Sequence, residues 1–225
     1  MHALLQRLRG RLVVSCQPVS GGPMDRVEIV VALALAARDG GAAGLRIEGA
    51  ANVAAVRAAC DLPILGLIKR DLADSPVRIT PLIADVQALA EAGADVVAFD
   101  ATERTRPVPV ADLLAEVRRH GRLAMADCAS PAEAQAAAQL GADIVGTTMS
   151  GYTGGPVPDL PDLEFVREAA RALDVPVLAE GRFNTPADAA AAIEAGAFAV
   201  VVGSAITRTE HVTGWFAQAV AKVQR

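Results

Sequence analysis

Aromatic residues are scarce in this sequence, and its positive charges do not outnumber its negative ones. Phe, Trp and Tyr together make up 3% of the 225 residues, and the formal net charge is −5. Proteins that bind single-stranded nucleic acid stack its bases on aromatic side chains, and proteins that follow a nucleic-acid backbone neutralise its phosphates with Lys and Arg. Both shortages argue against a nucleic-acid partner, while a small local site for one anion stays compatible with them.

Cysteine is rare as well, and a long uninterrupted apolar run is missing. The three cysteines, Cys16, Cys60 and Cys128, are odd in number and lack CxxC or other metal-ligand spacing. A disulfide framework is therefore not expected, and a reducing cytoplasm is the simplest location. The basic N-terminal residues are not followed by the apolar segment of a signal peptide, and no apolar run reaches transmembrane length uninterrupted. We expect a cytoplasmic protein without a membrane span.

Histidine, the commonest metal ligand, occurs three times, at His2, His120 and His211. None of these residues ends a predicted strand, and His120 precedes a glycine, where it is well placed to close a helix. A catalytic metal is therefore not expected, although carboxylates together with a substrate phosphate could hold a divalent cation.

Aliphatic residues and alanine, in contrast, are abundant, and hydrophobic residues form 52% of the chain. Eight short aliphatic runs alternate with segments rich in Ala, Leu, Glu and Arg, of which 81–92, 131–140 and 186–195 open near a proline that suits a first helical turn. The eight runs lie at 12–17, 44–47, 64–69, 96–100, 123–127, 144–148, 177–180 and 200–203. Strand alternating with helix eight times predicts a parallel sheet closed on itself, a (β/α)8 TIM barrel of one catalytic domain over residues 1–225. An open doubly wound sheet is the structural alternative.

Internal repetition supports the barrel. A glycine lies between helix and strand in the segments 40–42, 91–95, 140–143 and 194–197, where it can stop the helix in the left-handed conformation. Asp-Leu-Pro-Ile at 61–64 is echoed by Asp-Val-Pro-Val at 174–177, half a chain later. Such echoes are typical of a fold built from repeated βα units.

Polar side chains collect where the predicted strands end, which is where TIM barrels carry their chemistry. Side chains alternate in direction along a strand, so residues two apart share one face. We therefore infer that four strands direct a polar side chain inward in the uppermost layer. These side chains are Gln17, Lys69, Asp127 and either Glu180 or Arg182.

Lys69 is the main candidate for chemistry, because the apolar run 64–68 delivers it into a partly desolvated opening. Desolvation lowers the pKa of a lysine toward the range in which it can exchange protons. Less specific interpretations stay open: a strand-end lysine can be solvated or simply ion-paired, Glu180 can be its counter-ion, and Asp127 can be an orienting acceptor. Cys128 has the opposite parity and is expected in the core.

Two glycine-containing segments indicate a phosphate site. Glu-Gly-Arg at 180–182 follows the seventh strand, and Gly-Ser-Ala at 203–205 follows the eighth. TIM barrels often bind phosphate with these two loops, whose backbone N–H groups approach the oxygens. Arg182, Gly203, Ser204 and Arg208 are the candidate ligands. The segment 147–155, rich in Gly and Thr, is expected to form a flexible loop long enough to cover a ligand.

Several of these segments together resemble the N-acetylmannosamine-6-phosphate 2-epimerase family over nearly the whole chain. They include Gly-Leu-Arg-Ile-Glu-Gly at 44–49, Gly-Leu-Ile-Lys-Arg-Asp at 66–71, Ala-Asp-Cys at 126–128, Asp-Ile-Val-Gly-Thr-Thr at 143–148, Ala-Glu-Gly-Arg at 179–182 and Gly-Ser-Ala-Ile-Thr-Arg at 203–208. Leu72, where an aromatic residue is common, and Thr209, where proline is common, depart from the pattern. Neither departure touches the candidate site.

The resemblance implies an isomerase that interconverts N-acetylmannosamine 6-phosphate and N-acetylglucosamine 6-phosphate in sialic acid breakdown. Removal of the C2 proton of the open-chain sugar and its return on the other face would need two acid/base groups, for which Lys69 and Glu180 are suited. Gln17, Arg46 and Asp127 would hold the C1 oxygen, the hydroxyls and the acetamido group, and Arg182, Gly203, Ser204 and Arg208 the phosphate. No metal or redox cofactor is needed, and a homodimer is implied.

Two other function classes stay open. Lys69 could act as the nucleophile of a Schiff-base aldolase or lyase on a keto sugar acid. A non-catalytic barrel that senses phosphorylated metabolites would bind its ligand without exchange at C2. The closing helix, expected over 213–223 with Trp215, Phe216 and Val220 at helical spacing, could cap the barrel or contact a partner.

Overall fold

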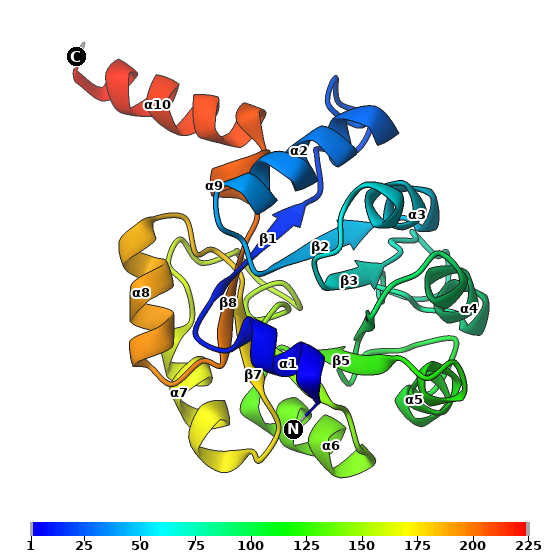
Figure 1. Ribbon diagram of the computed structural model, residues 1–225. Coiled ribbons are helices and arrows are strands. Elements are labelled where there is room, and N and C mark those ends of the chain that lie inside the picture. Colours follow the sequence, from blue (N-terminus) through cyan, green and yellow to red (C-terminus); the bar gives the residue numbers. More distant parts are fainter. Residues whose placement is uncertain (1, 224–225) are drawn as a thin grey trace.

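The computed structural model describes residues 2–223 and shows eight parallel strands closed into a ring in sequence order (Figure 1). The predicted (β/α)8 barrel is confirmed, and the open doubly wound sheet is wrong. The strands are β1 (Leu12–Cys16), β2 (Gly44–Glu48), β3 (Ile64–Leu67), β4 (Val96–Asp100), β5 (Leu123–Asp127), β6 (Ile144–Gly146), β7 (Val177–Glu180) and β8 (Ala199–Val202).

The strand ends follow the predicted runs closely, and the largest differences are at β3 and β6. The parallel ladder of β3 ends at Leu67, because the chain then folds into an antiparallel turn in which Lys69 pairs with Ile79. β6 ends at Gly146, two residues before its predicted end at 148. The residues that lie beyond these two strand ends include Lys69 and Thr148. Their side chains still line the cavity described below, although their backbone is outside the parallel ladder.

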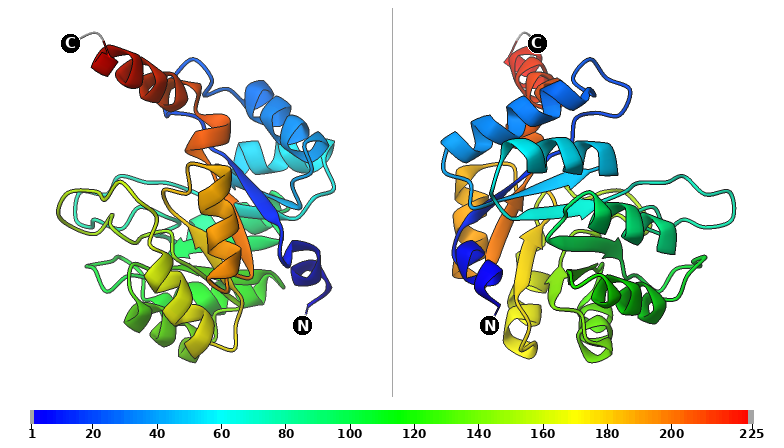
Figure 2. Two further views of the ribbon diagram at one scale, coloured as in Figure 1. Left: turned by 90° about the vertical axis from the view of Figure 1, so that its left-hand side faces the viewer. Right: turned by 45° about the vertical axis from the view of Figure 1, so that its right-hand side comes forward.

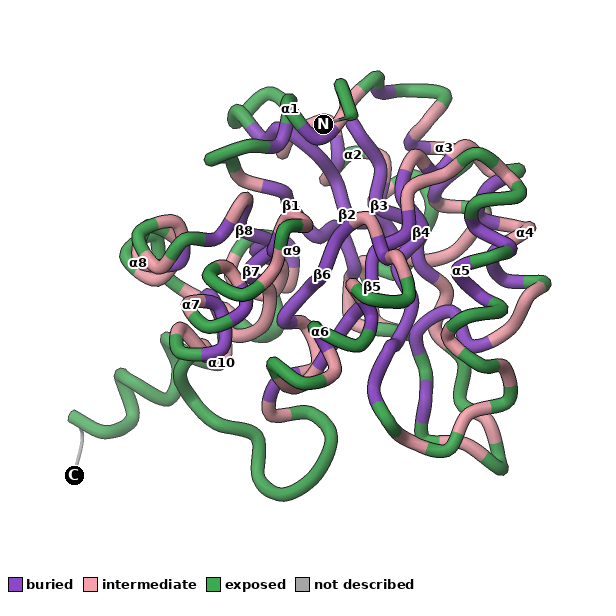
Figure 3. Tube along the Cα trace, turned by 90° about the horizontal axis from the view of Figure 1, so that it is seen from below, coloured by how far each residue is buried: buried purple, intermediate pink, exposed green. Residues whose placement is uncertain are grey.

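Two apolar layers result from the alternation of side chains along the strands. Inward residues such as Leu65, Met125 and Leu178 fill the ring, while outward residues such as Val14 and Ile47 pack against the helices. Figure 3 shows the strands as a buried centre surrounded by partly exposed helices. The near-continuous apolar runs of the sequence are explained by strands that are buried on both faces.

Helices cover the outside of the ring. They are α2 (Val27–Asp39), α3 (Ala50–Ala59), α4 (Ile83–Glu91), α5 (Val110–Arg119), α6 (Pro131–Leu140), α7 (Leu163–Ala172) and α8 (Pro186–Glu194). α6 and α8 both begin with proline after a side-chain cap, from Ser130 and Thr185. The predicted left-handed glycines after four of the helices are confirmed, with φ between +92° and +105° at Gly41, Gly93, Gly141 and Gly196.

The amino-terminal ends of the strands are covered by α1 (Ala3–Leu8), which the sequence did not predict (Figure 1). Its Leu5 and Leu8 are 5% and 0% exposed and join the apolar cluster inside the ring. A Cβ on Gly44, the first residue of β2, would lie 2.8 Å from Leu8 Cδ2. Glycine at that position therefore makes room for the helix against the strands.

The chain leaves the barrel after β8 through the short α9 (Ser204–Thr207) and then α10 (Thr209–Val223). α10 begins four residues before the predicted 213, and Figure 2 shows it projecting from the barrel. None of its residues is buried, and every residue from 215 to 223 is exposed. Within residues 2–223, no helix is long and apolar enough to cross a membrane.

Candidate active site

A cavity of about 370 Å³ opens at the carboxyl ends of the strands. Its walls come from the strand ends and from the loops after β6, β7 and β8, as the TIM-barrel architecture predicts. Eight of the nine predicted site residues line it: Gln17, Arg46, Lys69, Glu180, Arg182, Gly203, Ser204 and Arg208. The predicted inward orientation of Lys69 is thus confirmed. Asp127, the ninth, lies beneath the cavity and is 0% exposed.

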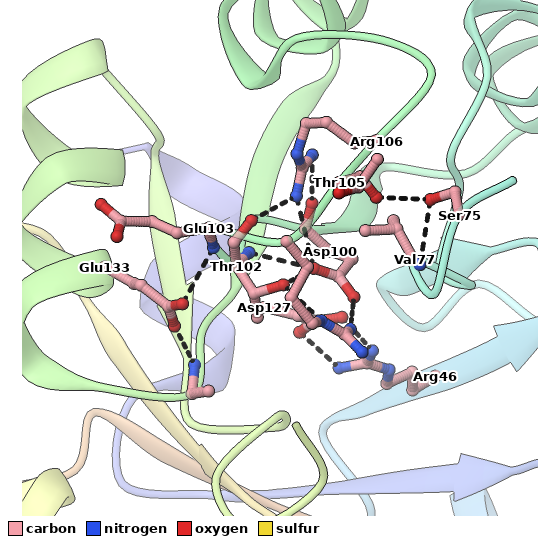
Figure 4. A network of polar contacts seen from close by, with 12 residues as sticks. Arg46, Ser75, Val77, Asp100, Thr102, Glu103, Thr105, Arg106, Asp127 and Glu133 are labelled. Atoms are coloured by element: carbon pink, nitrogen blue, oxygen red, sulfur yellow. Dashed lines mark hydrogen bonds and ion pairs between the residues drawn. The ribbon is translucent and has the colours of Figure 1, made fainter. Parts of the chain in front are cut away.

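Arg46 of β2 joins the two carboxylates at the floor of the cavity. Its guanidinium pairs with Asp127 of β5 (Nη2 to Oδ2, 2.6 Å) and with Oε2 of Glu180 on β7, and Arg46 itself is 1% exposed. Figure 4 shows Arg46 and Asp127 facing each other across the barrel. Both carboxylates raise the pKa of Arg46 against the lowering effect of burial, so a permanent positive charge is fixed below the cavity.

Glu180 and Lys69 have pKa values shifted toward each other. Burial raises the pKa of Glu180 to about 7, and nearby Asp127 adds to this, while Arg46 opposes it. Burial lowers the pKa of Lys69 to about 8, aided by the positive charges of Arg208 and Arg46. Near neutral pH both groups can therefore give or take a proton, as acid/base catalysis requires.

Thr148 is a site residue that the sequence reasoning did not single out for a role. Its Oγ1 donates to Asp127 Oδ1 at 2.6 Å, lies 3.3 Å from Glu180 Oε2 and accepts from Arg46 Nη1. The sequence could have indicated this role, because Thr148 lies two residues after Gly146, which pairs with the inward-facing Asp127. Residues two apart along a strand face the same side. Thr148 links the two carboxylates that Arg46 neutralises.

Arg182 uses most of its guanidinium to hold the loop between β6 and α7. Its Nε donates to the carbonyl oxygen of Leu160 at 2.7 Å, its Nη1 donates to that of Ser150, and the group lies over the Tyr152 ring, 5.4 Å from the centroid. Its backbone is held at φ +62°, which is uncommon outside glycine. The predicted phosphate contact of Arg182 stays a prediction, and it would use the remaining edge of the guanidinium.

The loops after β7 and β8 approach the cavity with small residues, as predicted. Gly203 lies directly over β1, since a Cβ there would be 3.2 Å from Ser15 Cβ. Arg208 Nε donates to the carbonyl oxygen of Gln17 at 2.8 Å, which fixes the guanidinium at the rim. His211 and Trp215 of α10 also line the cavity, a role that the sequence did not predict.

A second polar cluster, at the end of β4, has a structural role. The carboxylate of Asp100 accepts hydrogen bonds from Thr102, Arg104 and Arg106 and is 0% exposed (Figure 4). None of these four residues lines the cavity. Their mutual pairing explains why polar residues end β4 without joining the candidate active site.

Within residues 2–223 the three cysteines are buried, and the acidic and histidine side chains are dispersed. Cys128 is buried, as predicted, and burial raises its pKa and that of Cys16, the latter to about 12. In the part of the chain that the structure describes, no group of three His, Cys, Asp or Glu side chains could hold a metal ion. The expected absence of a catalytic metal stays a prediction.

Comparison with known proteins places this geometry in a family. Residues 30–222 match the family model described as "Putative N-acetylmannosamine-6-phosphate epimerase". The chain belongs to this epimerase family. The resemblance inferred from the sequence is thereby confirmed.

Members of the epimerase family match the chain over most of its length. It is 62% identical over 221 residues to the "Bifunctional enzyme NanE/NanK" of Brucella melitensis, of which it spans only 42%, and 57% identical to a "Putative N-acetylmannosamine-6-phosphate 2-epimerase" of Proteus mirabilis, of which it spans 90%. The solved N-acetylmannosamine-6-phosphate 2-epimerase from Clostridium perfringens superposes with a TM-score of 0.94 at 38% identity, covering 97% of this chain and 96% of that one.

Proposed function

We propose that this chain is an isomerase, an N-acylglucosamine-6-phosphate 2-epimerase that interconverts N-acetylmannosamine 6-phosphate and N-acetylglucosamine 6-phosphate in sialic acid breakdown. The observation that carries the proposal is the pair of Lys69 and Glu180, which line one cavity from β3 and β7. These strands are separated by three strands in either direction around the ring. The two groups are thus suited to act on opposite faces of one carbon atom. Family membership supports the choice of substrate.

The reaction begins with the open-chain sugar, whose C1 aldehyde acidifies the proton on C2. Lys69, as the free amine, takes this proton, and the electron pair of the C–H bond moves toward C1 to form an enolate. Glu180, as the carboxylic acid, gives a proton to the other face of C2, so its configuration is inverted. The reverse reaction uses the same two groups with their protonation states exchanged.

The floor of the cavity stabilises the negative charge of the enolate. Arg46 holds a fixed positive charge there, and its Nε has no hydrogen-bond partner in the described residues. Asp127 and Thr148 orient that guanidinium. Gln17 borders the same cavity and is positioned for the C1 oxygen, a hydroxyl or the acetamido group. Charge that develops over preorganised donors lowers the barrier to proton removal.

The phosphate binds at the loops after β7 and β8. Gly203, Ser204, Arg208 and Arg182 all line the cavity, where backbone N–H groups and two guanidinium groups are suited to hold a phosphate. An anchor at the phosphate fixes C2 relative to Lys69 and Glu180, and positioning of this kind contributes a large part of many rate enhancements.

Proton NMR with N-acetylmannosamine 6-phosphate in heavy water tests the proposal. We expect N-acetylglucosamine 6-phosphate with deuterium at C2. Conversion without deuterium would still support epimerase activity, but it would imply that the transferred proton does not exchange with solvent or that the mechanism is different. Absence of conversion by folded protein would overturn the proposal. Borohydride would then trap substrate on Lys69 if a Schiff-base lyase were correct, whereas a metabolite sensor would bind without conversion.

We further propose that the protein is a homodimer formed through α10. The helix exposes Phe216, Val220 and Val223, at 70%, 59% and 84%, on positions four and three residues apart that share one face. A contiguous exposed apolar face on a helix that projects from its own barrel supports contact with a second copy. The side chains of His211 and Trp215, at the start of the same helix, would connect this contact to the active site.

We also propose that residues 1–225 act as one catalytic domain in the cytoplasm. Support for one domain is the ring that runs unbroken from β1 to β8 with α1 beneath it. Support for the cytoplasm is that Cys16, Cys60 and Cys128 are all free and buried, as in proteins of reducing compartments. The low aromatic content and the negative net charge support the absence of a nucleic-acid partner.

A further inference from the structure

Glu48 is an acidic residue beside Lys69 that the proposed chemistry does not use. It is the last residue of β2, two positions after Arg46 and in register with Leu67 of β3. This register places it on the inward parity, next to the point where β3 ends. Its Oε1 accepts a hydrogen bond from the backbone N–H of Lys69 at 3.2 Å.

The hydrogen bond fixes Lys69 where the parallel ladder no longer does. Beyond Leu67 the chain turns into the antiparallel pair of Lys69 with Ile79, flanked by the hydrogen bond from Thr80 N–H to the Ile68 carbonyl. The Lys69 N–H points to β2 and meets the Glu48 carboxylate there. Glu48 therefore attaches the backbone of Lys69 to the barrel.

Glu48 contacts Lys69 from outside the substrate cavity. A second, smaller cavity of about 140 Å³ shares Gln17 and Lys69 with the first and is lined by Glu48 and Asn52 on its other side. Glu48 does not line the larger cavity. Glu48 is thus not part of the substrate cavity wall, and its hydrogen bond connects it to that wall through Lys69.

Two arginines and two carboxylates lie near Lys69 and act in opposite directions on its protonation. Arg208 and Arg46 oppose its protonation, while Glu48 and Glu180 favour it, and Glu48 is the larger of these two favourable effects. Glu180 is already paired with Arg46, whereas the structure shows no ion pair of Glu48 within residues 2–223. Glu48 is thus the carboxylate whose negative charge is available to Lys69.

The other acidic groups near the smaller cavity are committed elsewhere. Asp71 pairs with Arg78 at 2.5 Å, and both side chains are more than half exposed. Asp25 accepts a backbone N–H of its own loop at 2.8 Å. Water screens such exposed charges, so they have little effect on Lys69.

We propose that Glu48 is a positioning residue for Lys69, which it holds by its backbone N–H and by a negative charge that offsets Arg46 and Arg208. Its kinetic consequences rest on the proposed epimerase function, whereas its effect on the Lys69 amine does not. Two separate experiments can therefore test it.

The first experiment measures the amine directly. Lys69 and Lys222 are the two lysines of the chain, so protein labelled with 13C at lysine Cε gives two NMR signals, and exposed Lys222 is an internal reference. We expect the titration of Lys69, near pH 8 in the unchanged protein, to move to lower pH in Glu48→Gln, which loses the charge and keeps an acceptor. Asp71→Asn is the matched control and should leave the Lys69 titration in place. An unchanged titration in Glu48→Gln would overturn the charge effect.

The second experiment separates the charge from the hydrogen bond by kinetics. Glu48→Asp keeps a carboxylate, but its side chain is too short to reach the backbone N–H of Lys69. The titration of Lys69 in this variant should therefore stay near that of the unchanged protein. Its kcat should fall about tenfold to a hundredfold, which is the usual effect of a misplaced catalytic group. KM should change little, because Glu48 does not line the substrate cavity. Equal kcat in Glu48→Asp and the unchanged protein would overturn the positioning role. Circular dichroism confirms that each variant is folded, and absence of epimerisation in the unchanged protein would reject the proposed function without affecting the titration result.

Discussion

At the scale of single residues, the same environment moves two pKa values in opposite directions. Burial disfavours the charged form of each group, so it raises the pKa of the Glu180 carboxyl and lowers that of the Lys69 ammonium. Arg46 then attenuates the first shift and strengthens the second. Burial thus narrows the interval between the pKa values of an acid and a base that line one cavity, while the buried guanidinium of Arg46 lowers both values.

The pH dependence of kcat/KM should reflect this interval. The proposed reaction needs Lys69 as the free amine, and its pKa is lowered to about 8, so the rate should fall at lower pH. It also needs Glu180 as the carboxylic acid, whose pKa is raised to about 7, so the rate should fall at higher pH as well. We expect a bell-shaped profile with its maximum between these values, measured by a coupled or NMR assay at constant ionic strength. Glu180→Gln should remove one limb and lower kcat by a factor of about 100 or more. A flat profile from pH 6 to 9 would contradict the assignment of both groups.

Lys69→Met removes the amine that we propose transfers the C2 proton and retains the apolar stem. Isomerisation and C2 deuterium exchange should both become undetectable or fall by a factor of about 100 or more, because no nearby group replaces the base. Phosphate binding, measured by calorimetry with the substrate, should persist through Arg208 and the glycine loops. Full activity in this variant would reject the central role of Lys69.

Arg182→Lys tests whether Arg182 mainly holds the loop after β6. Lysine keeps the positive charge but cannot donate to Leu160 and Ser150 at once or match the guanidinium stacking on Tyr152. We expect faster proteolysis of the loop and a several-fold rise in KM, while a role in phosphate charge alone would leave the rate of proteolysis unchanged. Arg167→Lys, on an exposed helix surface, is the matched control.

Side-chain alternation predicted an inward direction for Lys69 and Glu180, because that rule needs only the strand boundaries, but it did not show that Asp127 would lie beneath the cavity. It correctly placed Lys69 and Glu180 on its walls. It could not predict that Arg46 would reach both Asp127 and Glu180, since those contacts cross the barrel between residues 81 and 134 positions apart. Nor could it predict that Arg182 would bind a loop, because its backbone conformation depends on the turn after β7.

At the scale of elements, α1 fills the lower end of the ring. Leu8→Ala should lower the free energy of unfolding by about 2–5 kcal/mol, the usual cost of removing a fully buried leucine. Denaturant unfolding followed by circular dichroism measures this change. Leu4→Ala, at a partly exposed position of the same helix, is the control and should cost much less. Because the candidate active site lies at the other end of the strands, kcat at low temperature should change little.

The strands and most helices were predictable because periodicity and capping residues act locally. α1 was not, because six residues are too few to show a helical period, and the barrel provides the apolar surface on which Leu5 and Leu8 pack. The direction of α10 was not predictable either. Its apolar spacing indicates a buried face, but the sequence does not say whether that face meets its own barrel or another molecule.

At the scale of the whole molecule, α10 should determine the oligomeric state. Replacement of Phe216 and Val220 by Asp introduces charge on the exposed apolar face, and we expect a dimer to become a monomer by analytical ultracentrifugation. Gln218→Asp changes a position between them on another side of the helix and should leave the dimer intact. A monomeric unchanged protein would contradict the proposed homodimer. Because His211 and Trp215 line the cavity from the same helix, loss of the dimer should also raise KM.

The closure of the barrel by α1 has a consequence for metabolic direction. With Leu5 and Leu8 in the lower end of the ring, the two sugars of the proposed reaction would enter and leave through the same opening above Lys69 and Glu180. They differ only in the configuration of C2 and would share the proposed phosphate anchor, so each should competitively inhibit the conversion of the other. A catalyst leaves the equilibrium constant between the two sugars unchanged, so the barrel by itself would not set the net direction. The net flow is then set by whichever neighbouring reaction removes one of the two sugars faster.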